Sequence, residues 1–494
     1  MRVNSENLSK IQNHISCPKY DRQNKKTGIV HIGVGGFHRS HQAFYLHQYL
    51  SKQMDKDWAI CGIGLRKEDH HMAIVMEEQD CLYTLITQHP DGKENIEIIG
   101  SITDYILAPE DPSKAIDKMA HSDTKIVSLT ITEGAYNFNP SNGQFDFENP
   151  DIKHELQYPD EPKTIFGYLT RALKKRRDTG LSPFTVLSCD NIIHNGDIAK
   201  NMLLAFVEKQ DKDLYNWIKE NVSFPNSMVD RITPVTSKKT IKSLDKDHGI
   251  FDKWPVVCEP FIQWIIEDDF CNGRPRLEEF GVQFVDDVTP YENMKIRLLN
   301  AGHSVLGIPG AIHGHPTIDA CMQDPSFAKF MRRFMDIEVT SLLGVIEGID
   351  INKYKDSLEG RFANPNIKDG VSRICSESSA KLPKFLIPTI MENLKLGTSI
   401  KYATFIIAAW CYYSDKQIDH MNQELEIIDS RKDDLHQYAN QYKNDPLSFL
   451  KLRDIFGDLI ENQVFVDQYK KMLNALHKEQ NIPNLLDQVC TNYL

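Results

Sequence analysis

One sixteen-residue stretch carries four polar side chains that could move and hold a proton. Residues 291–306 read as a helix in which Lys295, Asn300 and His303 stand among apolar residues. A helix that is apolar on most sides is normally buried, and an unpaired lysine is costly to bury. At about 100° per residue, these three side chains and Glu292 fall within an arc of roughly 140°. An amine, an amide, an imidazole and a carboxylate on one stripe indicate an active site for proton transfer.

The start of this helix leaves a structural alternative open for two of these residues. Thr289 is a candidate N-cap, Pro290 suits the first helical position, and Glu292 completes a capping box. Glu292 would then only satisfy backbone donors. Lys295 could equally bury its stem while its amine reaches solvent.

Composition sets the class of the protein. The 494 residues are 41% hydrophobic and 26% charged, as in an ordinary globular protein. A net charge of −12 argues against nucleic acid or an anionic membrane as partner. The polar N-terminus contains no secretory signal, and the longest apolar run, residues 405–413, is too short to span a bilayer. We therefore expect a cytoplasmic protein.

Strand and helix patterns alternate in the first part of the chain. We expect buried strands near residues 28–36, 58–65, 126–131 and 184–189, and antiparallel strands near 81–87 and 96–102. Helices are expected at 40–52, 164–177 and 196–209. This alternation predicts an α/β fold with a Rossmann-like doubly wound sheet in residues 1–288.

Helical patterns dominate residues 289–494. The predicted helices are 290–306, 327–347, 383–396, 399–413 and 446–458. We therefore expect a mostly helical substrate and catalytic domain after the Rossmann-like domain, with the active site in the cleft between the two.

A glycine cluster follows the first predicted strand. Residues 33–38, GVGGFH, approximate the dinucleotide fingerprint, in which glycines let the backbone approach a pyrophosphate at a helix N-terminus. His38 occupies the position of the last glycine, so the motif is imperfect. The cofactor-binding residues that we expect here are Gly33, Val34, Gly35, Gly36, Phe37 and Arg39.

Acidic residues follow the second strand, where a dinucleotide places its adenosine ribose. Asp69, together with Glu68, would accept hydrogen bonds from the ribose hydroxyls and repel a 2′-phosphate, which favours NAD over NADP. Arg66 and Lys67 lie beside them and could instead accommodate the phosphate.

Six ordered segments together resemble the polyol-specific long-chain dehydrogenases, over roughly residues 28–480. Two carry the resemblance, GVGGFHRSHQ at 33–42 and YENMKIRLLNAGH at 291–303. The other four are TITEGAY at 130–136, SCDN at 188–191, FPNSMVDRITP at 224–234 and RFANP at 361–365.

The resemblance implies metal-independent hydride transfer between a secondary alcohol and NAD(P). It makes Lys295 the general acid and base, and Asn191 and Asn300 the donors to the reacting oxygen. His303 would orient the substrate hydroxyl, and Glu292 would lie on a water path to solvent. A lysine base needs its pKa lowered from about 10.4, which burial and the positive nicotinamide ring would both favour.

Further residues match family positions that bind the remaining sugar hydroxyls, namely Asp230, Arg373 and Lys381. Within the family, the resemblance implies oxidation of D-mannitol to D-fructose, with arabinitol, sorbitol or a keto-uronate such as fructuronate as the alternative substrate. SESS at 376–379 stands where many relatives have an Asp-Gly turn, so the loop near the substrate differs.

Two other classes of function were weighed. A zinc alcohol dehydrogenase would need a cysteine and histidine ligand set, and neither the ten scattered cysteines nor His313 and His315 have that spacing, so no metal is expected. A catalytically silent NAD sensor would show a broken set of catalytic residues, whereas this set is complete. The family resemblance favours a monomer.

Overall fold

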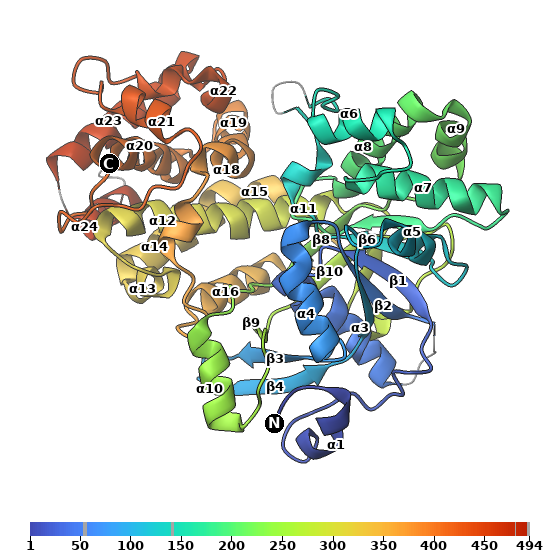
Figure 1. Cartoon of the computed structure of the whole chain (residues 1–494). Coiled ribbons are helices and arrows are strands. Elements are labelled where there is room, and N and C mark those ends of the chain that lie inside the picture. Colours follow the sequence, from blue (N-terminus) through green and yellow to red (C-terminus); the bar gives the residue numbers. More distant parts are fainter. Residues whose placement is uncertain (53–56, 140–142, 480, 492–494) are drawn as a thin grey trace. The chain divides into compact units, whose positions relative to one another are not determined.

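The computed structural model of the chain describes residues 1–52, 57–139, 143–479 and 481–491. Contacts divide it into two compact units. The first comprises Met1–His89 and Lys93–Thr289, and the second comprises Pro90–Gly92 and Pro290–Leu494. Figure 1 labels the helices and strands.

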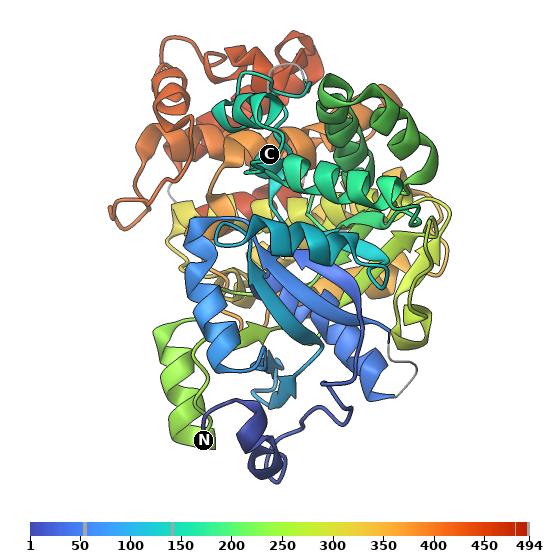
Figure 2. The same cartoon turned by 45° about the vertical axis from the view of Figure 1, so that its right-hand side comes forward.

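A five-stranded parallel sheet lies at the centre of the first unit. Its strand order is β5-β2-β1-β6-β7, with its strands side by side and twisted (Figures 1 and 2). The order reverses between β1 and β6, which is the switch point where such sheets bind ligands at the carboxyl ends of their strands. The bounds are β1 Thr27–Ile32, β2 Ala59–Gly64, β5 Ile102–Leu107, β6 Ile126–Leu129 and β7 Thr185–Ser188.

Helices cover both faces of this sheet, because its strands are apolar on both sides. One face packs Val30 and Ile32 against α5, α7 and α8, with Phe166 and Leu203 in the same core. The other face packs Ile29 and Ile60 against α3. The helices of this unit are α1 Leu8–Ile11, α2 Gly36–Ser40, α3 Gln42–Ser51, α4 His70–Glu78, α5 Pro112–Ala120, α6 Pro150–Gln157, α7 Ile165–Asp178, α8 Asn195–Gln210, α9 Lys212–Asn221 and α10 Lys238–His248.

Two small sheets complete the first unit. One has the order β4-β3-β9 and the other β11-β10-β8. Their strands are β3 Tyr83–Gln88, β4 Glu94–Ile99, β8 Ser227–Asp230, β9 Val256–Cys258, β10 Gln263–Glu267 and β11 Gln283–Val285. The antiparallel pairing of β3 with β4 was expected; β5 and β8 to β11 were not.

The second unit is helical. Its buried central helix, α20, contacts α12, α21 and α23. The α-helices are α11 Thr289–Met294, α12 Ala301–His313, α13 Ile318–Gln323, α14 Pro325–Phe334, α15 Thr340–Leu343, α16 Ile351–Phe362, α17 Val371–Cys375, α18 Ser378–Phe385, α19 Ile387–Leu396, α20 Lys401–Lys416, α21 Lys432–Ala439, α22 Arg453–Phe456, α23 Gln463–Lys478 and α24 Ile482–Cys490. Two π-helical segments also occur, η5 Lys295–Asn300 and η6 Met335–Val339.

A buried carboxylate caps the central helix. Glu338 in η6 is fully buried and accepts hydrogen bonds from the backbone N–H groups of Tyr402 and Ala403 at 2.8 and 2.9 Å, and from the Ser399 hydroxyl at 3.0 Å. It satisfies donors that the first turn of α20 leaves without intrahelical partners. Burial nevertheless raises the pKa of Glu338 to about 7, against the opposing effect of these hydrogen bonds.

The Rossmann-like and helical fold classes predicted from sequence are confirmed, and several element boundaries were wrong. The helix expected at 40–52 is interrupted at His41, whose backbone is not helical. The helix expected at 327–347 becomes π-helical at Met335 and ends at Leu343. In place of the helix expected at 446–458, the chain forms only the 3₁₀ helix Phe449–Lys451 and the four-residue helix α22. Thr289 is not an N-cap but the first residue of α11. Its backbone N–H donates a hydrogen bond to the Asp287 carboxylate at 2.8 Å.

Membrane insertion finds no support in the described residues, since none of their helices combines the length and apolar character needed to cross a bilayer.

Candidate active site

A cavity of about 460 Å³ opens at the carboxyl ends of β1, β2 and β6 in the first unit. Its wall is formed by residues that follow these three strands: Gly33, Val34, Gly35, Leu65, Arg66, Asp69, Thr130, Ile131 and Thr132. This is the edge of the sheet, at the switch point, where a doubly wound fold binds a dinucleotide.

The glycine turn has room for a ligand against its backbone. Gly33 needs to be glycine for the protein's own sake, because its φ is +93° and a Cβ there would lie 2.1 Å from the Thr130 carbonyl oxygen. A Cβ on Gly35 would meet no atom closer than 3.9 Å. Packing within the chain therefore does not require a glycine at position 35.

Arg39 and His38 follow the glycine turn on α2, and both side chains are buried beneath it. Arg39 is 1% exposed, and its guanidinium donates to the carbonyl oxygens of Gly35 and Trp254. Its charge therefore holds the turn by way of the Gly35 carbonyl. His38, in place of the third glycine, stacks on His31 with ring centroids 3.4 Å apart. Burial lowers the pKa of both imidazoles, so the stack is uncharged at neutral pH.

The two acidic residues expected at the ribose differ in position. Asp69 lines the cavity, and its carboxylate accepts from the Arg66 backbone N–H at 3.0 Å. The Arg66 guanidinium lies 3.4 Å from the same carboxylate, with a side chain that is 75% exposed. Glu68 is an exposed residue of the short helix Lys67–Asp69.

The loop that carries Asn191 is held by its neighbour Asp190. The Asp190 carboxylate accepts from the N–H groups of Ile131 and Thr132 at 3.1 and 2.7 Å, and from the Tyr136 hydroxyl at 2.7 Å. Thr132, in the cavity wall, has a φ of +70°, which is strained for a β-branched residue. Asp190 therefore fixes the cavity wall and anchors the chain directly before Asn191, whose own side chain is exposed.

Asp230 is the last residue of β8 and is 4% exposed. It pairs with Gln263 of β10, so a regular sheet positions its carboxylate. Asp230 was expected to bind substrate.

Four of the five expected catalytic residues lie in the second unit, on α11, η5 and α12. Glu292, Lys295 and Asn300 are 4%, 7% and 8% exposed, and the His303 side chain is 13% exposed. The lysine that the sequence pattern predicted to be buried is buried. The single α-helix predicted there is wrong, because η5 interrupts it between Lys295 and Asn300.

The π-helical segment changes which side chains share a face. A π-helix closes hydrogen bonds from residue i to residue i+5, so residues five apart lie about one turn apart on the same side. In an α-helix the same two residues would diverge by about 140°. Lys295 and Asn300 are five apart and bound the segment, so its geometry brings their two positions nearer to one face than an α-helix would.

His303 is held between a ring and a carboxylate. Its imidazole packs on Phe362, with centroids 4.4 Å apart, and its Nε2 lies 3.9 Å from the Asp369 carboxylate. The other Asp369 oxygen accepts from Arg373 Nε at 2.7 Å. Asp369 thus links His303 with Arg373, a residue expected to bind substrate whose side chain remains 61% exposed.

Lys381 donates from Nζ to the Ile374 carbonyl oxygen at 3.2 Å and lies 3.5 Å from the Ser376 hydroxyl. Burial lowers the pKa of its amine, and the charge of Arg373 adds to this effect. In the loop between Arg373 and Lys381, Glu377 adopts a left-handed φ of +50°. Its carboxylate accepts from the Ser430 backbone and hydroxyl, which anchors the loop without a glycine.

Comparison with known families decides the relationship of this chain. The model of the mannitol dehydrogenase Rossmann domain matches residues 27–279, and that of the mannitol dehydrogenase C-terminal domain matches residues 287–477. The chain belongs to the mannitol dehydrogenase family. The family membership and the oxidoreductase class expected from the sequence are therefore confirmed.

Relatives match this mannitol dehydrogenase family member over nearly its whole length. A mannitol 2-dehydrogenase of Aspergillus fumigatus is 43% identical, covering 97% of this chain and 97% of its own. The mannitol dehydrogenase 2 of Saccharomyces cerevisiae is 41% identical, covering 99% and 98%.

Two solved structures share the fold. Pseudomonas fluorescens mannitol 2-dehydrogenase, in a ternary complex with NAD and D-mannitol, is 41% identical with a TM-score of 0.89, covering 99% of this chain and 100% of its own. A D-sorbitol dehydrogenase in substrate-free form is 35% identical with a TM-score of 0.91, covering 98% and 100%. The backbone alone therefore does not separate the two substrates.

Sequence reasoning missed two carboxylates of this family member's site. Asp190 directly precedes Asn191, and Asp369 stands four residues before Arg373. The second spacing is the i, i+4 signature of a helical ion pair and could have been read.

Proposed function

We propose that this chain is an NAD-dependent mannitol 2-dehydrogenase that interconverts D-mannitol and D-fructose without a catalytic metal. The observation that supports this chemistry is that Lys295 and Asn300 are both buried and lie at the two ends of one π-helical turn. The substrate rests on the similarity to proteins named mannitol 2-dehydrogenase.

Each of the proposed catalytic residues has its own role in the oxidation. Bound NAD supplies the acceptor for the hydride that leaves C2 of the polyol. Lys295 Nζ takes the proton of the C2 hydroxyl, so that the C–O bond becomes a carbonyl as the C–H bond breaks. Asn300 and Asn191 donate amide hydrogens to this oxygen, where negative charge develops. Glu292 passes the proton from Lys295 towards solvent, and in ketose reduction the proton moves the other way.

The remaining polar residues of the proposed site would bind and orient the substrate. His303, steadied by Phe362 and Asp369, holds a hydroxyl next to the reacting carbon. Asp230, Arg373 and Lys381 bind the hydroxyls further along the open chain. Because Arg373 and Lys381 are cations, a keto-uronate such as fructuronate is the rival substrate.

Cofactor choice rests on the cavity beside β2. Asp69 lines this cavity and would accept hydrogen bonds from the adenosine ribose hydroxyls, which supports NAD rather than NADP.

Initial rates with a substrate panel test this function. Mannitol, arabinitol and sorbitol are offered with NAD and NADP, and fructose and fructuronate with NADH and NADPH. We expect mannitol oxidation with NAD to be fastest, and to persist after treatment with a chelator. Oxidation of sorbitol at C2 also yields fructose, so the polyol formed from fructose and NADH is identified by chromatography. Sorbitol as the product, or brisk fructuronate reduction without mannitol oxidation, would overturn the assignment.

A further inference from the structure

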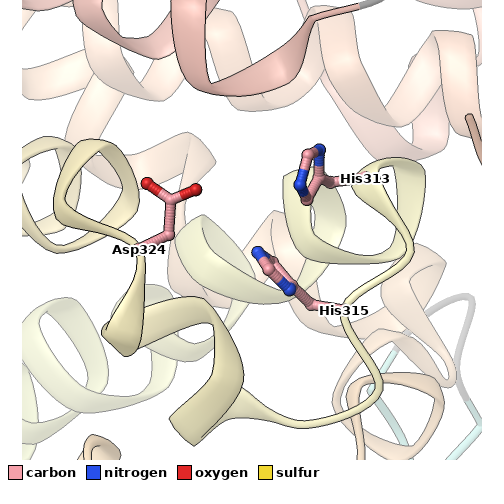
Figure 3. A group of neighbouring side chains, drawn as sticks. All are labelled: His313, His315 and Asp324. Carbon is pink, nitrogen blue, oxygen red and sulfur yellow. The ribbon is translucent and has the colours of Figure 1, made fainter.

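Two imidazoles and a carboxylate converge at the C-terminal end of α12 (Figure 3). One ligand atom from each of His313, His315 and Asp324 lies within 4.8 Å of the other two. We propose that these three residues bind a divalent transition-metal ion of the zinc type, in a site that the proposed dehydrogenase chemistry does not use.

The distances allow coordination after small side-chain rotations. Three atoms no more than 4.8 Å apart have a common centre within about 2.8 Å of each. Zinc bonds to imidazole nitrogen and carboxylate oxygen are about 2.0–2.2 Å, so each ligand atom needs to move by less than about 1 Å. Nitrogen and oxygen donors of this kind suit zinc and its neighbours in the first transition row.

The backbone brings the two histidines together. His313 is the last residue of α12, and Gly314 ends the helix with a φ of +95°. The N–H groups of Gly314 and His315 both bond to the Gly310 carbonyl oxygen at 2.9 Å, which closes the turn tightly. The reversal leaves the two imidazole rings 4.6 Å apart.

Asp324 is fixed from a different helix. It is the N-cap of α14, and its Oδ1 accepts from the Ser326 N–H at 2.9 Å. Among the residues described, no donor is recorded for Oδ2, so this oxygen can serve a ligand without loss of the cap. The carboxylate also supplies the negative charge that a dication requires.

Buried nitrogens in the cluster have no hydrogen-bond partner. His313 Nδ1 and His315 Nε2 are shielded from solvent and unpaired within the described part of the chain. Leaving a buried polar atom unsatisfied costs about 1–3 kcal/mol, and such atoms in native structures need an explanation. A metal bond, which uses a nitrogen lone pair of the neutral ring, would provide one.

An aromatic ring lies beside the two histidines. Phe327 packs against both rings, with centroids 5.9 and 5.2 Å away, and restricts their rotation.

A bound ion would cross-link α12 to α14. His313 lies ten residues beyond His303, about 15 Å along a helix axis, so the ion would stabilise the scaffold rather than join the reaction. The role expected is therefore structural.

The test is direct zinc binding by the tag-free, full-length protein after removal of metals with a chelator. Competition with a chromophoric zinc chelator gives stoichiometry and Kd, and thermal unfolding with and without Zn²⁺ gives the shift in Tm. We expect one equivalent to bind at this site and Tm to rise with zinc concentration. His315→Ala and Asp324→Asn should each weaken binding by about tenfold or more, and both should remove the shift in Tm.

Two controls separate coordination from folding. Asn is a good N-cap, so Asp324→Asn removes the charge while keeping the cap of α14. His248→Ala removes an exposed histidine at the end of α10 and should leave binding unchanged. Absence of zinc binding by the wild-type protein would overturn the proposal, and so would unchanged Kd values in both cluster variants.

Discussion

Lys295 and Asn300 are the first and last residues of a π-helical segment, and both side chains are buried. The extra residue in this turn places an amine above an amide on one side of the helix, where an α-helix would turn them apart by about 140°. π-Helical turns are rare and often found at functional sites. In the proposed mechanism the irregularity has a specific consequence, because Lys295 as proton acceptor and Asn300 as oxyanion donor would both have to face the reacting oxygen.

Replacement of Lys295 by alanine should lower kcat for mannitol oxidation by about 10²–10⁴-fold, because the general base is lost while the cofactor site is untouched. NAD binding, measured by the quenching of protein fluorescence, should be unchanged. The matched control is Arg297→Ala in the same segment. Arg297 pairs with Glu392 at 2.8 Å, so its loss should lower stability while kcat keeps its pH profile. Near-wild-type turnover of the Lys295 variant would remove lysine from the mechanism.

Asp369→Asn should raise KM for the polyol by about tenfold and lower kcat less. The Asp369 carboxylate accepts from Arg373 Nε at 2.7 Å and faces His303 Nε2 at 3.9 Å, so it positions two substrate-binding groups. Hydrogen bonds to charged groups contribute about 1.5–3 kcal/mol. Because the Arg373 side chain is partly exposed, solvent screening lowers this contribution. Steady-state kinetics over a pH series gives the readout, since a purely structural residue would lower stability without this split between KM and kcat.

The sequence predicted the sheet and the burial of Lys295 better than the exact geometry of the helix that carries Lys295. β1 and β2 are continuous apolar runs ending in glycine, and the Lys295 stripe stands out from its apolar neighbours. Short strands such as β9, with three residues, lack enough alternation to be read. The interruption at Lys295–Asn300 was not predictable, because the same residue types favour an α-helix and packing selects the π turn.

The supporting carboxylates escaped prediction for a different reason. Asp190 and Asp369 are ordinary acidic residues in the sequence, and their importance comes from partners distant along the chain. Asp190 reaches Thr132 across 58 residues, and Asp369 reaches His303 across 66. These two contacts depend on tertiary packing, which local patterns do not encode, whereas the i, i+4 pair of Asp369 with Arg373 could have been read locally.

Asp69→Ser should shift cofactor preference towards NADP by about tenfold or more in the ratio of kcat/KM values. Removal of the carboxylate ends repulsion of a 2′-phosphate and releases Arg66, whose guanidinium lies 3.4 Å away, to bind it. Glu68→Gln is the matched control, because Glu68 is exposed and adjacent, and it should leave the preference unchanged. If Glu68→Gln changes the preference as much as Asp69→Ser, the assignment of Asp69 to the ribose is wrong.

Glu338 should make the stability of the second unit depend on pH. Its pKa is about 7 in the folded chain and near 4.5 when exposed, so the folded state binds more protons between these values. The contribution of Glu338 to the free energy of unfolding is therefore greatest below pH 4.5. This contribution falls by about 3 kcal/mol as pH rises through 7. Glu338→Gln keeps the shape and an acceptor oxygen but cannot ionise. The difference in unfolding free energy between wild type and this variant should accordingly shrink as pH rises from 5 to 8, measured by denaturant unfolding at each pH. A difference that stays constant over that range would mean that Glu338 is ionised throughout and stabilises α20 as a carboxylate.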